Sequence, residues 1–91
     1  MQQKDEKTKQ LAKKIGKIIK KYRLQNKKGS INRFAHEYDL DVGNTSRIEN
    51  GLTDVKLVTL WKISEALGIK TSEVVKLAEK QLGDDFLFYE V

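Results

Sequence analysis

The chain has 91 residues, enough for one small domain with a single core and too few for two. Cysteine is absent, which excludes disulfides and thiolate zinc sites, and the lack of proline together with 34% charged residues favours helix. No apolar run approaches the roughly 18 residues that a membrane span needs, so we expect a cytoplasmic protein with no membrane partner.

The net charge of +5 is unevenly distributed along the chain. Residues 1–29 carry ten lysines and Arg23 against two acids, a balance of +9, whereas residues 30–60 and residues 61–91 each carry −2. A basic surface favours a polyanionic partner. Composition alone leaves open the alternative that the lysines form a solvated face and only confer solubility.

The first predicted element is a long amphipathic helix. After a polar start that we expect to be frayed, from Met1 to about Glu6, apolar residues follow the spacing of one helical face. They are Leu11, Ile15, Ile18, Ile19 and Tyr22. The helix should end near Asn26, before a turn at residues 27–29.

The second predicted helix begins at Ser30 or Asn32, either of which can act as its N-cap. Its expected inner face holds Phe34, Ala35 and Tyr38. A tight turn at residues 39–41 follows, because aspartate tolerates the left-handed conformation better than most residues that have a side chain.

The third predicted helix runs from about Val42 to Asn50, buries Thr45 and Ile48, and is ended by Gly51. Two short helices with a three-residue turn form a helix-turn-helix, here at about residues 31–50. Its second helix can enter a DNA major groove about 12 Å wide. Any small helical bundle contains helix pairs with such spacing, so the pattern alone leaves DNA binding as one of two interpretations.

Two further helices and an aromatic tail complete the prediction. The apolar residues of the fourth helix are Leu57, Leu60, Trp61, Ile63 and Leu67. We interpret Trp61 as a core residue, and Gly68 ends this helix. The fifth helix is capped by Thr71 or Ser72 and ends at Gly83. The sequence therefore predicts an all-α domain of five helices with an extended or β-like C-terminal tail.

Four stretches stand in the order and spacing of a known family. They are Ile15-Gly16 with Ile19, Tyr22 and Arg23; Phe34-Ala35; Ser46-Arg47-Ile48-Glu49-Asn50-Gly51; and the run from Leu57 to Ile69. Together they resemble the Cro/lambda-repressor-like helix-turn-helix family, also called the XRE family. The resemblance covers residues 15–77. Residues 1–14 would be a basic N-terminal extension of the first helix, and residues 78–91 the end of the fifth helix and the tail. It implies a domain that binds double-stranded DNA without a cofactor or a metal.

The resemblance also implies which residues meet the bases. They stand at the start of the third helix and a turn and a half later: Val42, Gly43, Asn44 and Arg47. Arg47 can bind guanine bidentately and Asn44 can do the same for adenine. Val42 offers only an apolar contact, such as one to a thymine methyl group, and Gly43 offers close approach of the backbone. The alternative for Arg47 is a solvated surface arginine.

Other positions are expected to contact phosphate or to support the fold. The expected phosphate contacts are Lys27, Lys28, Ser30, Arg33, Ser46, Asn50 and Lys56. Arg23 and Glu49 match a pair that forms a partly buried salt bridge between the first and third helices in many members. Asp41 is interpreted as the N-cap of the third helix. The sequence departs from the family pattern at Ile31, where many members have glutamine, and at Asp39, which replaces the turn glycine.

The tail lies beyond the residues that carry the resemblance. Its apolar residues are Phe86, Leu87, Phe88, Tyr89 and Val91, and left free they would form an aggregation-prone edge. We expect the tail to fold back onto the domain or to pair with another subunit. Our hypothesis is a homodimer built by Phe86, Phe88, Tyr89 and the fifth helix, with half-sites about 34 Å apart.

The sequence thus favours a transcriptional regulator that reads the major groove with residues 42–50 as a homodimer. Two alternatives remain open: an antitoxin with the same fold whose tail binds a toxin protein, and a protein-interaction module without sequence-specific DNA binding. Paired carboxylates, a glycine-rich phosphate loop and an activated nucleophile are missing from the sequence, and His36 has no partner at metal-ligand spacing. We therefore expect no enzymatic activity.

Overall fold

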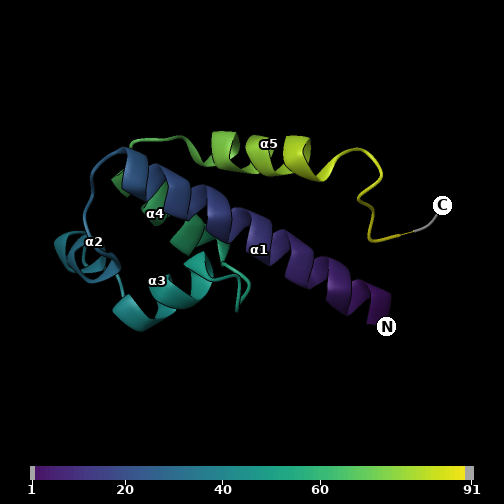
Figure 1. Ribbon diagram of the computed structural model, residues 1–91, viewed down its shortest axis with the longest axis horizontal. Helices are drawn as coiled ribbons and strands as arrows, with labels where there is room; N and C mark the ends of the chain where they lie inside the picture. The colour runs from purple at the N-terminus through teal and green to yellow at the C-terminus, as the bar shows by residue number, and fades with distance from the viewer. Residues whose placement is uncertain (1, 90–91) are drawn as a thin grey trace.

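The computed structural model describes residues 2–89, with side chains from residue 6 onward, and contains five α-helices (Figure 1). They are α1 (Gln2–Gln25), α2 (Ile31–Glu37), α3 (Val42–Glu49), α4 (Leu57–Leu67) and α5 (Thr71–Leu82). The described residues contain no strand, so the all-α prediction is confirmed, and residues 83–89 of the tail follow α5 without helix or strand. Within this range no helix is both long enough and apolar enough to span a membrane.

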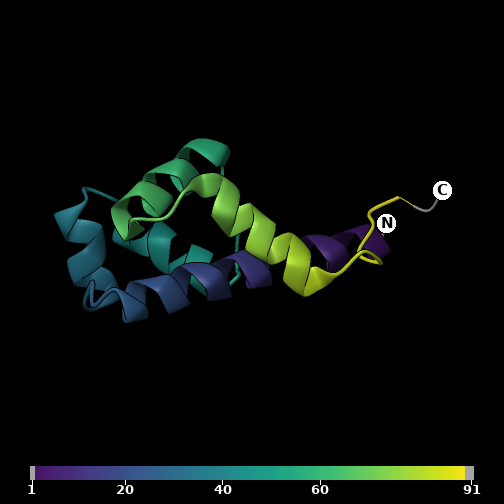
Figure 2. The same cartoon turned by 90° about the horizontal axis from the view of Figure 1, so that it is seen from above.

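The longest helix, α1, organises the molecule. It packs against α3, α4 and α5: in the view of Figure 1, α5 lies above α1, α3 below it and α4 behind it, where α4 also contacts α5 (Figures 1 and 2). The first turns of α1 and the tail after α5 extend together from the same end of the body, which gives the molecule extents of 44 × 22 × 20 Å.

The core lies where these helices meet. Its largest fully buried side chains include Phe34, Ile19, Ile48, Ile63, Leu67 and Val74. Burial of one such side chain contributes about 1.5–3 kcal/mol to the free energy of folding. The predicted apolar stripe of α1 is confirmed: Ile15, Ile18 and Ile19 are buried, and Leu11 and Tyr22 pack against them at the edge of the core.

Hydrogen bonds from side chains fix where α2 and α3 begin. The Ser30 hydroxyl accepts the backbone N–H of Arg33 at 3.1 Å, and the Asp41 carboxylate accepts that of Asn44 at 2.7 Å. Both predicted caps are therefore confirmed, and the turn between the helices places Asp39 at a φ of 56°, as expected for the left-handed region. The α3 helix ends at Glu49, with Asn50 as its C-cap.

Several details of the sequence prediction are wrong. The start of the chain, which we expected to be frayed to about Glu6, is helical from Gln2 onward. Helix α5 begins one residue earlier than expected, so Lys70 occupies its N-cap and neither Thr71 nor Ser72 caps it. Tyr38, at the C-cap of α2, is 36% exposed and contacts the inner face through the ring of Phe34, 5.3 Å away between centroids.

The largest correction concerns Trp61, which we expected in the core. Its side chain is 54% exposed and that of Leu57 is 65% exposed. The core-facing stripe of α4 consists of Leu60, Ile63, Ser64 and Leu67, at i, i+3, i+4 and i+7. Leu57 and Trp61 therefore lie on a neighbouring face that the rest of the described chain leaves uncovered.

Candidate nucleic-acid interface

The recognition helix of the predicted helix-turn-helix is α3. All the residues that we expect to contact bases lie on its solvent-exposed side. The four residues proposed to meet bases are exposed: Val42, Gly43, Asn44 and Arg47. Thr45, Ile48 and Glu49 from the same helix are buried. The helix is thus fixed by one side to the domain while its other side is open to a large partner.

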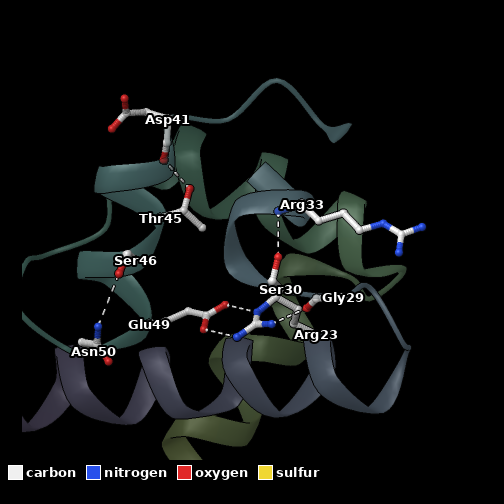
Figure 3. Close-up of polar contacts among 9 residues, drawn as sticks. All are labelled: Arg23, Gly29, Ser30, Arg33, Asp41, Thr45, Ser46, Glu49 and Asn50. Atoms are coloured by element: carbon white, nitrogen blue, oxygen red, sulfur yellow. Dashed lines mark hydrogen bonds and ion pairs between the residues drawn. The ribbon is translucent and has the colours of Figure 1, made fainter. Parts of the chain in front are cut away.

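The first turn of α3 is fixed by Asp41. Besides capping Asn44 with its carboxylate, Asp41 accepts the Thr45 hydroxyl at its backbone oxygen, at 2.7 Å (Figure 3). The carboxylate therefore satisfies a backbone donor that would otherwise lack a partner. Its negative charge also lies at the positive end of the helix dipole, where it is stabilising.

The last turn of α3 is fixed by a buried ion pair. Arg23 on α1 donates from Nε to Glu49 Oε2 at 2.7 Å and from Nη2 to Glu49 Oε1 at 2.9 Å, a bidentate arrangement (Figure 3). The predicted pair is confirmed. The same guanidinium donates from Nη1 to the backbone oxygen of Gly29 at 2.5 Å, so Arg23 connects α1, the loop before α2, and α3. The pKa of Arg23 is raised, chiefly by its hydrogen bond to Glu49.

Two glycines allow α1 to approach this end of α3 closely. A Cβ at Gly16 would lie 2.3 Å from the backbone oxygen of Ile48 and 2.6 Å from that of Glu49. A Cβ at Gly51 would lie 2.7 Å from the Cα of Lys13, and Gly51 also has a φ of 69°. From the sequence we predicted no structural role for Gly16. A glycine inside a helix costs roughly 1 kcal/mol relative to alanine, which is the signal that it meets a steric need.

The basic side chains expected at phosphates lie in the loop before α2 and at its start. Lys27 is exposed and has a φ of 55°. Lys28 is half-buried, and its ammonium lies 3.0 Å from the Tyr38 hydroxyl and 5.3 Å from the centre of that ring. Ser30 is occupied as the N-cap of α2. The Arg33 guanidinium extends away from the domain (Figure 3) and is exposed.

The remaining expected phosphate contacts flank the other end of α3. The Asn50 amide and the Ser46 hydroxyl lie 3.5 Å apart, one helical turn from each other (Figure 3). Lys56 is exposed at the N-cap of α4. Polar or basic groups therefore lie on both sides of the exposed surface of α3. Among the described residues, no group of three potential metal ligands is close enough to hold an ion.

The tail folds back onto α1, which is the first of the two arrangements expected for it. The ammonium of Lys7 donates to the backbone oxygen of Leu87 and lies 5.6 Å from the centre of the Phe86 ring. Phe86 and Phe88 form an edge-to-face pair with centroids 5.5 Å apart. Residues 90–91, which include the apolar Val91 of the sequence prediction, lie outside the described residues.

The second helix of the helix-turn-helix, α3, is held in place at both of its ends and has one side exposed. An all-helical domain that presents a helix in this way has the architecture of a DNA-binding domain. The chain belongs to the helix-turn-helix family, whose sequence pattern matches residues 19–74. It is 43% identical over 67 residues to the control protein C.MunI of Mycoplasma sp, covering 74% of this chain and 90% of that relative. No solved structure gives a significant match.

These findings confirm the resemblance to the XRE type of helix-turn-helix domain and identify a DNA-binding transcriptional regulator. Of the three interpretations that the sequence left open, they support the regulator over the antitoxin and the interaction module. The family match begins at residue 19 and ends at residue 74. The first part of α1, most of α5 and the tail therefore lie outside it.

Proposed function

We propose that this regulator recognises a specific DNA sequence by inserting the exposed surface of α3 into the major groove. The observation that carries the proposal is that Val42, Gly43, Asn44 and Arg47 are all exposed on a helix fixed at both ends, by Asp41 and by Glu49. Arg47 supplies the strongest base contact, because a guanidinium can bind guanine at two atoms. Asn44 can do the same for adenine, and the other two residues allow close approach.

The phosphate contacts come from the groups on either side of α3. Lys27, Arg33 and Lys56 are exposed cations and supply charge without sequence preference. Ser46 and Asn50 supply neutral hydrogen-bond donors close to the bases. The acids of the helix-turn-helix reduce this attraction only in part, because Glu49 is paired with Arg23 and the Asp41 carboxylate accepts the backbone N–H of Asn44 at the positive end of the α3 dipole.

The regulator acts as a homodimer, which would place two α3 helices on successive turns of one face of the duplex, about 34 Å apart. We assign the contact between subunits to the groove between α4 and α5 rather than to the tail. That groove is lined by Leu57, Trp61, Ile69 and Val75, three of which are exposed large apolar side chains. The tail is a weaker candidate because Phe86 and Leu87 already contact α1.

Selection of preferred sites from random-sequence duplexes, at two salt concentrations, tests this function. We expect one enriched sequence with two related half-sites. We also expect binding that weakens steeply as salt rises, because neutralised phosphates release counterions. Enrichment of no sequence, or affinity that does not depend on salt, would contradict the proposal.

A further inference from the structure

A second concave surface is lined by α1, α5, the tail and the loop between α3 and α4, and by no residue of α3. It is a cleft of about 800 Å³, within the range typical of small-molecule sites. Its walls include Leu11 and Ile15 of α1, Ala78 and Leu82 of α5, and Phe86 and Phe88 of the tail. Most of the lining residues lie outside the family match at residues 19–74, so the DNA-binding function does not account for this cleft.

The charged residues that line the cleft are acidic, whereas the chain as a whole has a positive net charge. Three of the described residues that line it are acidic, namely Asp54, Glu79 and Asp84, and none of the described lining residues is basic. Lys7 lies nearby and keeps its positive charge in its hydrogen bond to the backbone oxygen of Leu87, so three acids at the cleft face one neighbouring base. An apolar cleft lined by three acidic residues therefore occurs in a protein whose net charge is +5.

The tail adds aromatic surface to this wall. Phe86 and Phe88 pack edge to face, and one face of Phe86 already attracts the Lys7 ammonium at 5.6 Å. Aromatic rings attract cations through their negative faces, most strongly where water is excluded. The cleft thus offers the two features that a hydrophobic cation needs, apolar contact area and compensating negative charge.

We propose that this cleft binds a small hydrophobic organic cation. The apolar walls from α1 and α5 enclose the body of such a ligand, and Asp54, Glu79 and Asp84 lie at the edge to balance its charge. The proposal does not depend on DNA binding, because the cleft and α3 share no residue. Failure of sequence-specific DNA binding would therefore leave it unaffected.

Two probe ions of the same size and opposite charge test the proposal. Tetraphenylphosphonium and tetraphenylborate would each be titrated into the full chain by calorimetry. We expect the cation to bind with a Kd at least about tenfold lower than that of the anion. The net charge of the chain would by itself favour the anion, so this order of affinities identifies the acidic cleft. Equal binding, or tighter binding of the anion, would overturn the proposal.

Matched variants locate the site. D54N/D84N removes two acids of the cleft and should abolish most of the cation preference. E37Q/E73Q removes the same net charge at exposed positions outside the cleft and should retain it. Circular dichroism would confirm that both variants fold. Equal losses in both variants would place the cation elsewhere and refute the assignment.

Discussion

The ion pair between Arg23 and Glu49 is the one place where two charges are buried together in the described chain, and it lies directly behind the recognition helix. Taking both charges out of water is costly, and bidentate hydrogen bonding together with the third bond to Gly29 offsets that cost. Since hydrogen bonding raises the pKa of Arg23, its stabilising effect is complete below the ordinary pKa of arginine. This contribution from Arg23 would be lost as the pH rises through its higher pKa in the folded protein.

Replacing Glu49 with alanine should lower the free energy of unfolding by about 3–5 kcal/mol, because Arg23 would remain buried without its partner. Urea denaturation followed by circular dichroism measures this loss. Glu37→Ala is the matched control: the side chain is exposed on α2, and we expect a change within about 0.5 kcal/mol. A similar small change for Glu49→Ala would show that the pair contributes little.

The two kinds of DNA contact should respond differently to alanine substitution. Arg47→Ala should relax the preference at one base pair by about 1–3 kcal/mol, because a bidentate base contact is lost. Lys56→Ala should instead weaken binding to all sequences alike and reduce the salt slope by about one. Fluorescence anisotropy with the selected site and single-base variants separates the two effects. Unchanged base preference in Arg47→Ala would remove this residue from the recognition surface.

At the scale of elements, the crossing of α1 and α3 is set by backbone contact. Gly16 brings α1 against the carbonyl groups of Ile48 and Glu49, and this contact also determines where Arg23 meets Glu49, about two helical turns further along α1. The position of the recognition helix thus depends on the absence of a side chain at Gly16 as much as on the ion pair.

Gly16→Ala should therefore destabilise the fold by at least about 1–3 kcal/mol, the usual cost of overpacking a tight contact. Gly43→Ala is the matched control within α3. A Cβ there meets only the Asp41 carboxylate, at an ordinary 3.6 Å, so we expect stability to be unchanged or to rise by up to about 1 kcal/mol. Thermal unfolding of both variants makes the comparison, and equal effects would exclude the close approach as the cause.

The sequence predicted all five helices, and the reasons for its errors are physical. Apolar spacing located α1 and α3, and glycine located the ends of α3, α4 and α5. In α4, however, apolar residues occur on more than one face, so periodicity could not tell whether Leu57 or Leu60 points inwards. Only packing against α1 and α5 decides this, and it left Trp61 outside.

The candidate site was predictable to a similar degree. The resemblance assigned Arg23 and Glu49 to an internal pair, and the structure confirms it. It also selected positions on α3 that the structure shows to be exposed, although their contacts with bases stay a prediction. The sequence could not decide whether the tail folds back onto the domain or pairs with another subunit, nor assign a role to Gly16, because both contacts join residues far apart in the chain.

For the whole molecule, the exposed groove between α4 and α5 predicts how two subunits associate. Trp61→Glu should convert the proposed dimer to a monomer, because a charge in the centre of an apolar interface loses its hydration. Leu52→Glu is the matched control, since Leu52 is an exposed apolar residue outside the groove and should leave the mass unchanged. Light scattering measures the mass of each variant. A Trp61→Glu protein that remains dimeric would exclude this groove.

The N-cap of α3 has a consequence for how long the regulator stays on DNA. Asparagine caps a helix about as well as aspartate, so the negative charge of Asp41 is not required for the hydrogen bond to Asn44. That charge lies beside the residues proposed to enter the groove and repels phosphate.

Asp41→Asn should therefore lengthen the residence time on DNA severalfold with little change in stability. Surface plasmon resonance would measure this as a slower dissociation rate. Asp39→Asn, in the preceding turn, is the comparison, and an equal change there would assign the effect to overall charge. An aspartate at this cap would keep the complex with DNA short-lived. The fraction of DNA sites that are occupied would then follow changes in the concentration of the regulator with little delay.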